Sequence, residues 1–290
     1  MNLLVVTQRH RHPDDGPNWV RRRFERCEVA AASGRLAPDD LLRPGTDVWF
    51  YREPAPETPV PFSIPTIFED DDLLVVDKPP FLATMPRGRH ITETALVRLR
   101  RFTGNPELSP AHRLDRLTSG VLLFTKHRRV RGVFQRLFAG ASKQLEKQYD
   151  AIAPLRSLSP TTWADVQTKR VGELQATSTP ACGEAPNAVT DLLSVTPLDP
   201  AEQAAMQRRH GLPSGSDLAR YALRPRTGRT HQLRRHMMDY AAPILGDPIY
   251  PQVQEEPDPP NFSRPLELVA RRLRFTDPRS GVDREFVSHR

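Results

Sequence analysis

A single carboxylate, Asp115, lies among basic side chains where a loop leads into an apolar run. Its neighbours include His112, Arg113 and Arg116. Nearby positive charges favour the ionised form of a carboxylic acid, which is the form that attacks as a nucleophile. Asp115 is therefore a candidate nucleophile for a polyanionic substrate. The same composition also fits a surface aspartate that pairs with an arginine in a turn.

The whole stretch from His112 to Gly120 reads H-R-L-D-R-L-T-S-G, and the apolar residues 121–124 follow it. Such a run is typical of a buried strand. The stretch closely resembles the H-R-L-D-x-x-T-S-G signature of the RluA-type RNA pseudouridine synthases. In that family the aspartate is the catalytic nucleophile, so the resemblance implies that Asp115 is catalytic.

Residues 145–153 read L-E-K-Q-Y-D-A-I-A and predict a strand. They resemble the second family motif, K-x-Y-x-A. A tyrosine in a strand is ordinarily a core residue. The resemblance instead implies that Tyr149 is an active-site residue that stacks on the uracil and is a candidate for proton transfer.

Residues 221–238 contain a third cluster, in which a strand and a glycine-bearing turn precede a predicted helix. Thr230 is the expected helix cap, and the helix N-terminus beside Arg229 is a natural anion site. The cluster resembles the family motif T-G-R-T-H-Q-I-R-x-H. That match implies that Arg229 forms an ion pair with Asp115 and that Leu233 packs against the target base.

The resemblance also implies further contacts with the substrate. Arg113 and Arg116 are expected to contact phosphate or to fill the gap that a flipped nucleotide leaves. The expected substrate-binding residues are Arg113, Arg116, Thr118, His231 and Leu233.

Pseudouridine formation breaks the bond from ribose C1′ to uracil N1, rotates the base and joins C1′ to C5. The reaction involves no redox change, so the resemblance implies no cofactor. A metal site is also not expected. His231 and His236 are five residues apart, off one helix face, and lack the acidic ligand of an H-E-x-x-H site.

The composition fits a soluble, basic protein with a polyanionic partner. Among 290 residues, 42 Lys and Arg outnumber 35 Asp and Glu, which gives a formal charge of +7. This excess favours RNA as the partner, although an ordinary basic protein has a similar charge. Cys27 and Cys182 form no paired spacing, and no stretch is long and apolar enough to span a membrane. We expect a cytoplasmic monomer.

The chain is expected to have two domains. Residues 1–60 form a small N-terminal domain, with a basic helix predicted at 21–26. Residues 42–51 resemble the L-x-P-G-D-x-V ending of a small RNA-binding domain named after a ribosomal protein. Prolines are concentrated in 54–65, which predicts a stiff connector. Residues 61–290 then form the catalytic domain.

The resemblance implies an α+β pseudouridine synthase fold, with a mixed, mostly antiparallel central sheet flanked by helices. The residue patterns predict a hairpin over 67–78, a helix over 92–102 capped by Thr92, and another over 130–138. Residues 172–186 predict a loose turn region. A short helix is expected at 201–208, and a strand pair with a turn at 266–278.

Two other classes of function compete with this interpretation. One is a non-catalytic RNA-binding protein that kept the fold. Its weakness is that Asp115, Tyr149 and Arg229 are all present. The other is a hydrolase of glycosidic bonds, which usually needs two carboxylates on either side of the bond. None of the matched motifs supplies a second acid.

Overall fold

The computed structural model describes residues 19–50, 56–88, 90–139, 145–169, 173–180, 183, 185–255, 257 and 259–290. The chain separates into two compact units, Met1–Glu57 and Thr58–Arg290. The domain boundary predicted from proline content lies at residue 60. Pro54, the first proline of the predicted connector, lies outside the described residues.

The described residues of the smaller unit form one helix and a three-stranded antiparallel sheet. Helix α2 spans Trp19–Glu25, which confirms the helix predicted over 21–26. The strands are β1 (Val29–Ala31), β2 (Gly34–Arg35) and β3 (Trp49–Phe50), in the order β2-β1-β3. RNA binding by this unit stays a prediction.

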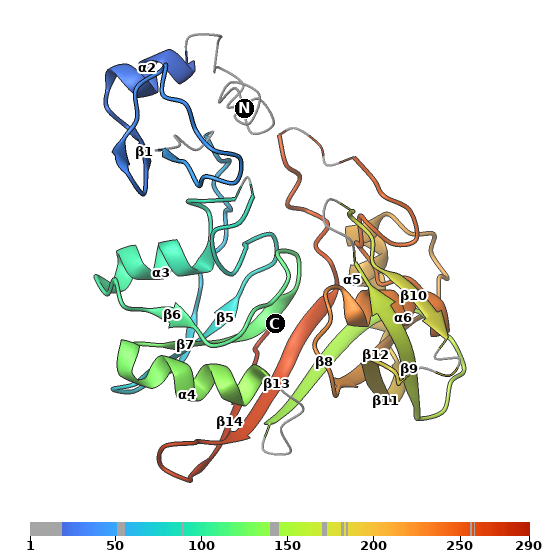
Figure 1. Ribbon diagram of the computed structural model, residues 1–290. Coiled ribbons are helices and arrows are strands. Elements are labelled where there is room, and N and C mark those ends of the chain that lie inside the picture. The colour runs from blue at the N-terminus through green and yellow to red at the C-terminus, as the bar shows by residue number, and fades with distance from the viewer. Residues whose placement is uncertain are drawn as a thin grey trace. The chain divides into compact units, whose positions relative to one another are not determined.

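The larger unit is built on an 11-stranded sheet, in which nine strands follow the order β10-β9-β11-β12-β8-β13-β7-β5-β4 (Figure 1). Strand β14 pairs with β13, and β6 pairs with β7. Between the described strands of this sheet, the pairings are antiparallel except that of β13 with β7. The predicted α+β class with a mixed, mostly antiparallel sheet is therefore confirmed.

The strand bounds are β4 Thr66–Glu69, β5 Leu73–Lys78, β6 Ser109–Pro110, β7 Ser119–Thr125, β8 Leu145–Pro154, β9 Thr161–Thr168, β10 Thr177–Pro180, β11 Ala188–Pro197, β12 Leu218–Pro225, β13 Leu268–Thr276 and β14 Asp283–Val287. Strands β5 and β7 are buried along their whole length, and each contains an apolar run, 73–76 and 121–124, that is typical of a buried strand. Strands β4 and β5 form the predicted hairpin.

Four helices of the described residues pack on this sheet: α3 (Ala95–Thr103), α4 (Arg128–Ala139), α5 (Pro200–His210) and α6 (Gln232–Tyr240). Helices α3 and α4 lie near β7 and β5, whereas α6 packs on β9 and β11 (Figure 1). Helix α4 buries its apolar stripe in the core, as helical periodicity predicts. No helix among the described residues has the length and apolarity to cross a membrane.

The two predicted helix caps are wrong. Helix α3 is capped by Thr94, whose hydroxyl accepts from the amide of Val97 at 3.2 Å, and Thr92 lies two residues earlier. Helix α6 has His231 in the capping position, in the left-handed region and without a side-chain cap bond. Thr230 therefore lies before the cap, because the tight turn ends one residue later than the sequence pattern indicates.

Two strand predictions also need correction. Strand β10 lies inside the region predicted as a loose turn and pairs with β9. Residues 266–278 contain one strand, β13, and its hairpin partner β14 comes after them. Both partners are short segments with weak apolar alternation, so their strand character comes from pairing with a longer neighbour.

The last glycine of the Asp115 motif is required by the central strands. Gly120 lies opposite Ala270 where β7 and β13 run parallel, and its φ is +107°. A Cβ atom there would lie 2.4 Å from the carbonyl oxygen of Ala270. Ala270 in turn pairs with Tyr149 on β8. Close backbone approach at Gly120 therefore sets the spacing between the Asp115 loop and Tyr149.

Gly120→Ala should destabilise the protein by about 2–4 kcal/mol, because positive-φ strain and overpacking add at this position. Urea unfolding followed by circular dichroism measures the change. Gly104→Ala is the matched control. Its φ is +66° and no atom lies within 4 Å of the added Cβ, so its cost should be only about 1 kcal/mol. Equal losses in the two variants would contradict the packing argument.

Candidate active site

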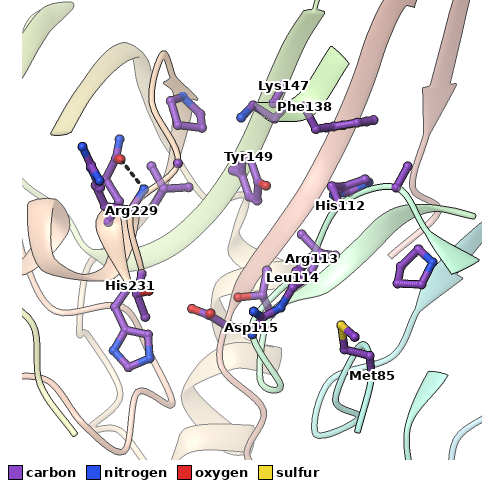
Figure 2. A pocket seen from close by; sticks show the side chains of 18 of the residues that line it. Met85, His112, Arg113, Leu114, Asp115, Phe138, Lys147, Tyr149, Arg229 and His231 are labelled. Atoms are coloured by element: carbon purple, nitrogen blue, oxygen red, sulfur yellow. Dashed lines mark hydrogen bonds between the residues drawn. The ribbon is translucent and has the colours of Figure 1, made fainter. Parts of the chain in front are cut away.

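The three motifs meet in one cleft of about 660 Å³ (Figure 2). Asp115 comes from the loop before β7, Tyr149 from β8, and Leu233 from the first turn of α6. Asp115 supplies the one carboxylate among the lining residues in the described part of the chain. The polar and charged residues that also line the cleft include His112, Arg113, Thr118, Lys147, Arg229, His231 and Arg234.

Asp115 pairs with Arg234 and not with Arg229. The Asp115 carboxylate is 35% exposed, and its Oδ2 lies 3.9 Å from Nη1 of Arg234. Arg229 lines the cleft but is exposed, and its Nε donates to the carbonyl of Asn187 at 3.1 Å. The predicted ion pair with Arg229 is therefore wrong. Arg229 lies in the turn before α6, whereas Arg234 lies on the buried face of that helix.

Arg234 is held by a second carboxylate deep in the protein. Its side chain is 2% exposed, and Nε and Nη2 donate to Asp247 at 2.7 and 2.6 Å. Asp247 also accepts the amides of Ile249 and Tyr250 at 2.9 and 3.1 Å. Burial opposes the charge, but Asp247 and Asp115 outweigh it and raise the pKa of Arg234. Asp115 thus faces a permanent, fixed cation.

The loop that carries Asp115 is fastened on both sides. Before it, the Thr84 hydroxyl donates to the carbonyl of Leu114 at 2.8 Å and accepts its amide at 3.1 Å. After it, the ammonium of Lys78 donates to the carbonyl of Arg116 at 3.2 Å. These bonds limit the positions that the carboxylate can adopt.

Lys78 supports the Asp115 loop, and the sequence motifs assigned it no role in the site. Its side chain is fully buried, and its ammonium also donates to the carbonyls of Pro79 at 2.9 Å and Leu82 at 2.8 Å. Burial holds the pKa of Lys78 well below its usual value, while Asp115 opposes this shift. A lysine that follows the apolar run 73–76 and Asp77 was the available signal, because a charge in a buried strand needs several acceptors.

Tyr149 and Leu233 line the cleft close to Asp115. Burial, with a smaller effect of Asp115, raises the pKa of Tyr149, so its phenol stays protonated at neutral pH. Leu233 is buried and packs in the same core cluster as Leu223. An aromatic face and an aliphatic side chain beside a carboxylate provide a surface for a planar base.

The remaining predicted residues occupy different positions. Arg113 is exposed and lines the cleft, and Thr118 lines it from a buried position. His231 also lines it, and burial lowers its pKa to about 4. Arg116 is half-buried and outside the lining set. Contact of these residues with substrate stays a prediction.

His112 does not contribute the positive charge that the sequence suggests. Its ring stacks on Phe138 at 4.3 Å between centroids, and its Nε2 accepts the amide of Leu123 at 3.2 Å. Burial, aided by Lys147, lowers its pKa to about 3. The imidazole is therefore neutral near pH 7 and supports the loop by packing.

The two histidines of the third motif lie in different environments. His236 is fully buried, and its Nδ1 lies 2.9 Å from the hydroxyl of Thr190. Its ring packs edge-on against Trp163, whereas His231 faces the cleft. Among the described residues, no group of three or more His, Cys, Asp or Glu side chains could hold a metal ion.

Asp247→Asn should destabilise the protein by about 3–5 kcal/mol, because it leaves the Arg234 cation buried without its main partner. Urea unfolding at neutral pH measures this loss. Asp239→Asn is the matched control on the outer side of α6. It breaks a partly exposed pair with Arg235 and should cost about 0.5 kcal/mol. A loss no larger than that of the control would contradict the role of Asp247.

Comparison with known families agrees with the geometry of the cleft. Residues 72–239 match the family model described as RNA pseudouridylate synthase. The human pseudouridylate synthase RPUSD2 is 33% identical over 219 residues, which cover 75% of this chain but only 35% of that protein. The chain thus spans about a third of that relative's length.

A bacterial relative is matched over most of its length. The dual-specificity RNA pseudouridine synthase RluA of Vibrio vulnificus is 32% identical over 217 residues, which cover 74% of this chain and 78% of that protein. The solved human RNA pseudouridylate synthase domain containing 1 is 27% identical, with a TM-score of 0.57. That match covers 77% of this chain and 82% of the solved one. The chain therefore belongs to the RNA pseudouridine synthase family, in its RluA-type branch.

Proposed function

We propose that this protein isomerises specific uridines to pseudouridine in structured RNA, with Asp115 as the nucleophile acting on a flipped-out uridine. The observation that carries the proposal is the cleft carboxylate, held 3.9 Å from the buried guanidinium of Arg234. Tyr149 and Leu233 line the same cleft. This combination supplies an anion, its fixed counter-cation and a surface for a base.

The chemistry needs few groups. The C1′–N1 bond breaks, the base turns, and a C1′–C5 bond forms. The proton on C5 is lost and N1 gains one, so the product is an isomer of the substrate. Arg234 supplies a fixed counter-cation 3.9 Å from the Asp115 carboxylate. Three first steps fit an anionic Asp115: attack on C1′, removal of a sugar proton, or addition to C6.

Base flipping accounts for the shape and lining of the cleft. An enzyme that acts on the glycosidic bond takes the nucleotide out of the stack and reads it in a pocket. The Tyr149 ring offers an aromatic face to the extruded base, and Leu233 packs against it. Arg113 is exposed at the cleft and fits a phosphate contact, or fills the gap that the base leaves. Arg116 and Thr118 lie near it in the same loop.

The competing functions fit the cleft less well. A glycosidase usually places two carboxylates on either side of the bond, whereas the described lining residues include Asp115 alone as a carboxylate. A protein that only binds RNA has no need for a buried Arg234–Asp247 pair directed at an open carboxylate. An isomerase uses both the single carboxylate of the described cleft lining and the buried Arg234–Asp247 pair.

The RNA substrate is the finer part of the proposal. Ribosomal RNA is slightly favoured over transfer RNA, because a small N-terminal unit that resembles an RNA-binding domain precedes the catalytic body. The Vibrio vulnificus relative is named a dual-specificity RNA pseudouridine synthase, so both classes of RNA are included in the test below. We also propose that the protein needs no cofactor or metal, since the isomerisation is redox-neutral and needs no second reactant. We further propose that it acts as a cytoplasmic monomer without a membrane partner, in keeping with the composition and the spacing of its two cysteines.

Asp115→Asn should abolish pseudouridine formation and leave RNA affinity within a few-fold of the wild type, because the carboxamide keeps the shape but cannot act as a nucleophile. Sequence-resolved pseudouridine mapping compares RNA from the wild type, a deletion strain and the Asp115→Asn strain. The pseudouridine sites lost in the two mutant strains should coincide, and their positions would identify the RNA substrate. If no site disappears in either strain, the isomerase proposal is wrong.

RNA affinity should fall steeply with salt, because lysine and arginine contacts to phosphate release counterions. For about six phosphate contacts, the dissociation constant should rise roughly a thousandfold between about 50 and 200 mM salt. Filter binding with the Asp115→Asn protein measures this without turnover. An affinity that is flat across this range would argue against an RNA partner.

A further inference from the structure

Lys147 lines the cleft on the same strand face as Tyr149. The two residues are two positions apart on β8, and alternate side chains of a strand point to the same side. Both belong to the lining of the cleft and extend into it from β8 (Figure 2). Glu146 alternates to the other face, where it lies 3.7 Å from Arg224.

The ammonium of Lys147 differs from those of the other described lysines. Lys78 donates to three carbonyls, Lys126 pairs with Glu69 at 2.8 Å, and Lys169 donates to a carbonyl at 3.1 Å. In the part of the chain that the structure describes, the Lys147 ammonium has no hydrogen-bond or ion-pair partner. Burial also lowers the pKa of Lys147.

A partly buried cation without an acceptor costs free energy, so an acceptor from the substrate would account for its position. Asp115 is the one carboxylate among the described lining residues, and it already faces Arg234. Arg113 and Arg229 add two further exposed cations to the lining. This part of the cleft is therefore suited to an anionic group of the ligand.

The position of Lys147 relative to Tyr149 indicates which anionic group of the ligand it would contact. Two residues along a strand correspond to about 7 Å. A base stacked on Tyr149 therefore leaves its sugar–phosphate backbone within reach of the four-carbon stem of Lys147. A phosphodiester is the anion that RNA provides at that distance, and a lysine binds it as a point charge.

We propose that Lys147 binds the phosphodiester adjoining the flipped uridine and so positions that nucleotide over Tyr149 and Asp115. This inference rests on the proposed function and adds a specific phosphate contact to it. Lys147 is a substrate-positioning residue, so its loss should raise KM and the dissociation constant far more than it lowers kcat.

The test is a double-mutant cycle between Lys147 and single RNA phosphates. The probe is a synthetic RNA hairpin with a uridine loop, in which one loop phosphate at a time is replaced by a neutral methylphosphonate. Lys147→Met keeps the apolar stem and removes the charge. At one linkage, the neutral phosphate should weaken wild-type binding roughly tenfold and leave binding by Lys147→Met unchanged.

Two matched variants sharpen the result. Lys147→Arg should keep the coupling, whereas Lys126→Met removes an equal charge at the distant Glu69 pair and should show none. The salt slope of Lys147→Met should be lower by about one phosphate contact. If every neutral linkage weakens Lys147→Met as much as the wild type, the inference is wrong. The proposed function is judged separately, by loss of pseudouridine in Asp115→Asn.

Discussion

The cleft depends on one buried guanidinium. Arg234 is 2% exposed, and a cation at that depth is tolerated only when carboxylates neutralise it and accept its hydrogen bonds. Asp247 takes two of its donors, which leaves Nη1 directed toward Asp115. The turn before Asp247 is itself tightly packed, since a Cβ at Gly246 would lie 1.9 Å from the carbonyl of Pro265. Helix α6, this turn and the Asp115 loop are therefore fixed together.

The sheet order explains why residues far apart in the chain meet. Strand β13 lies between β7 and β8, so the loop before β7 and the middle of β8 are two strand positions apart. Helix α6 follows β12, the other neighbour of β8. A C-terminal strand thus inserts between the two strands that present Asp115 and Tyr149. The glycine at 120 allows its backbone to approach closely.

Burial sets which groups in the cleft carry charge. It lowers the pKa of His112 to about 3 and that of His231 to about 4, so both imidazoles are neutral at physiological pH. It also raises the pKa of Tyr149, which keeps the phenol protonated. The charge pattern near the base therefore comes from Asp115, Arg234 and the cations around them.

The sequence by itself determined the local elements and the chemical types of the site: the β4–β5 hairpin, the stripe of α4, and the carboxylate, tyrosine and leucine that line one cleft. The match to the third motif assigned the ion pair with Asp115 to Arg229. Only the tertiary structure showed that Arg234 takes this position, because the turn exposes Arg229 while the helix face buries Arg234 against Asp247. Lys78 likewise became interpretable only once the fold brought three carbonyls around its ammonium. Burial and long-range pairing depend on contacts between segments that no local pattern contains.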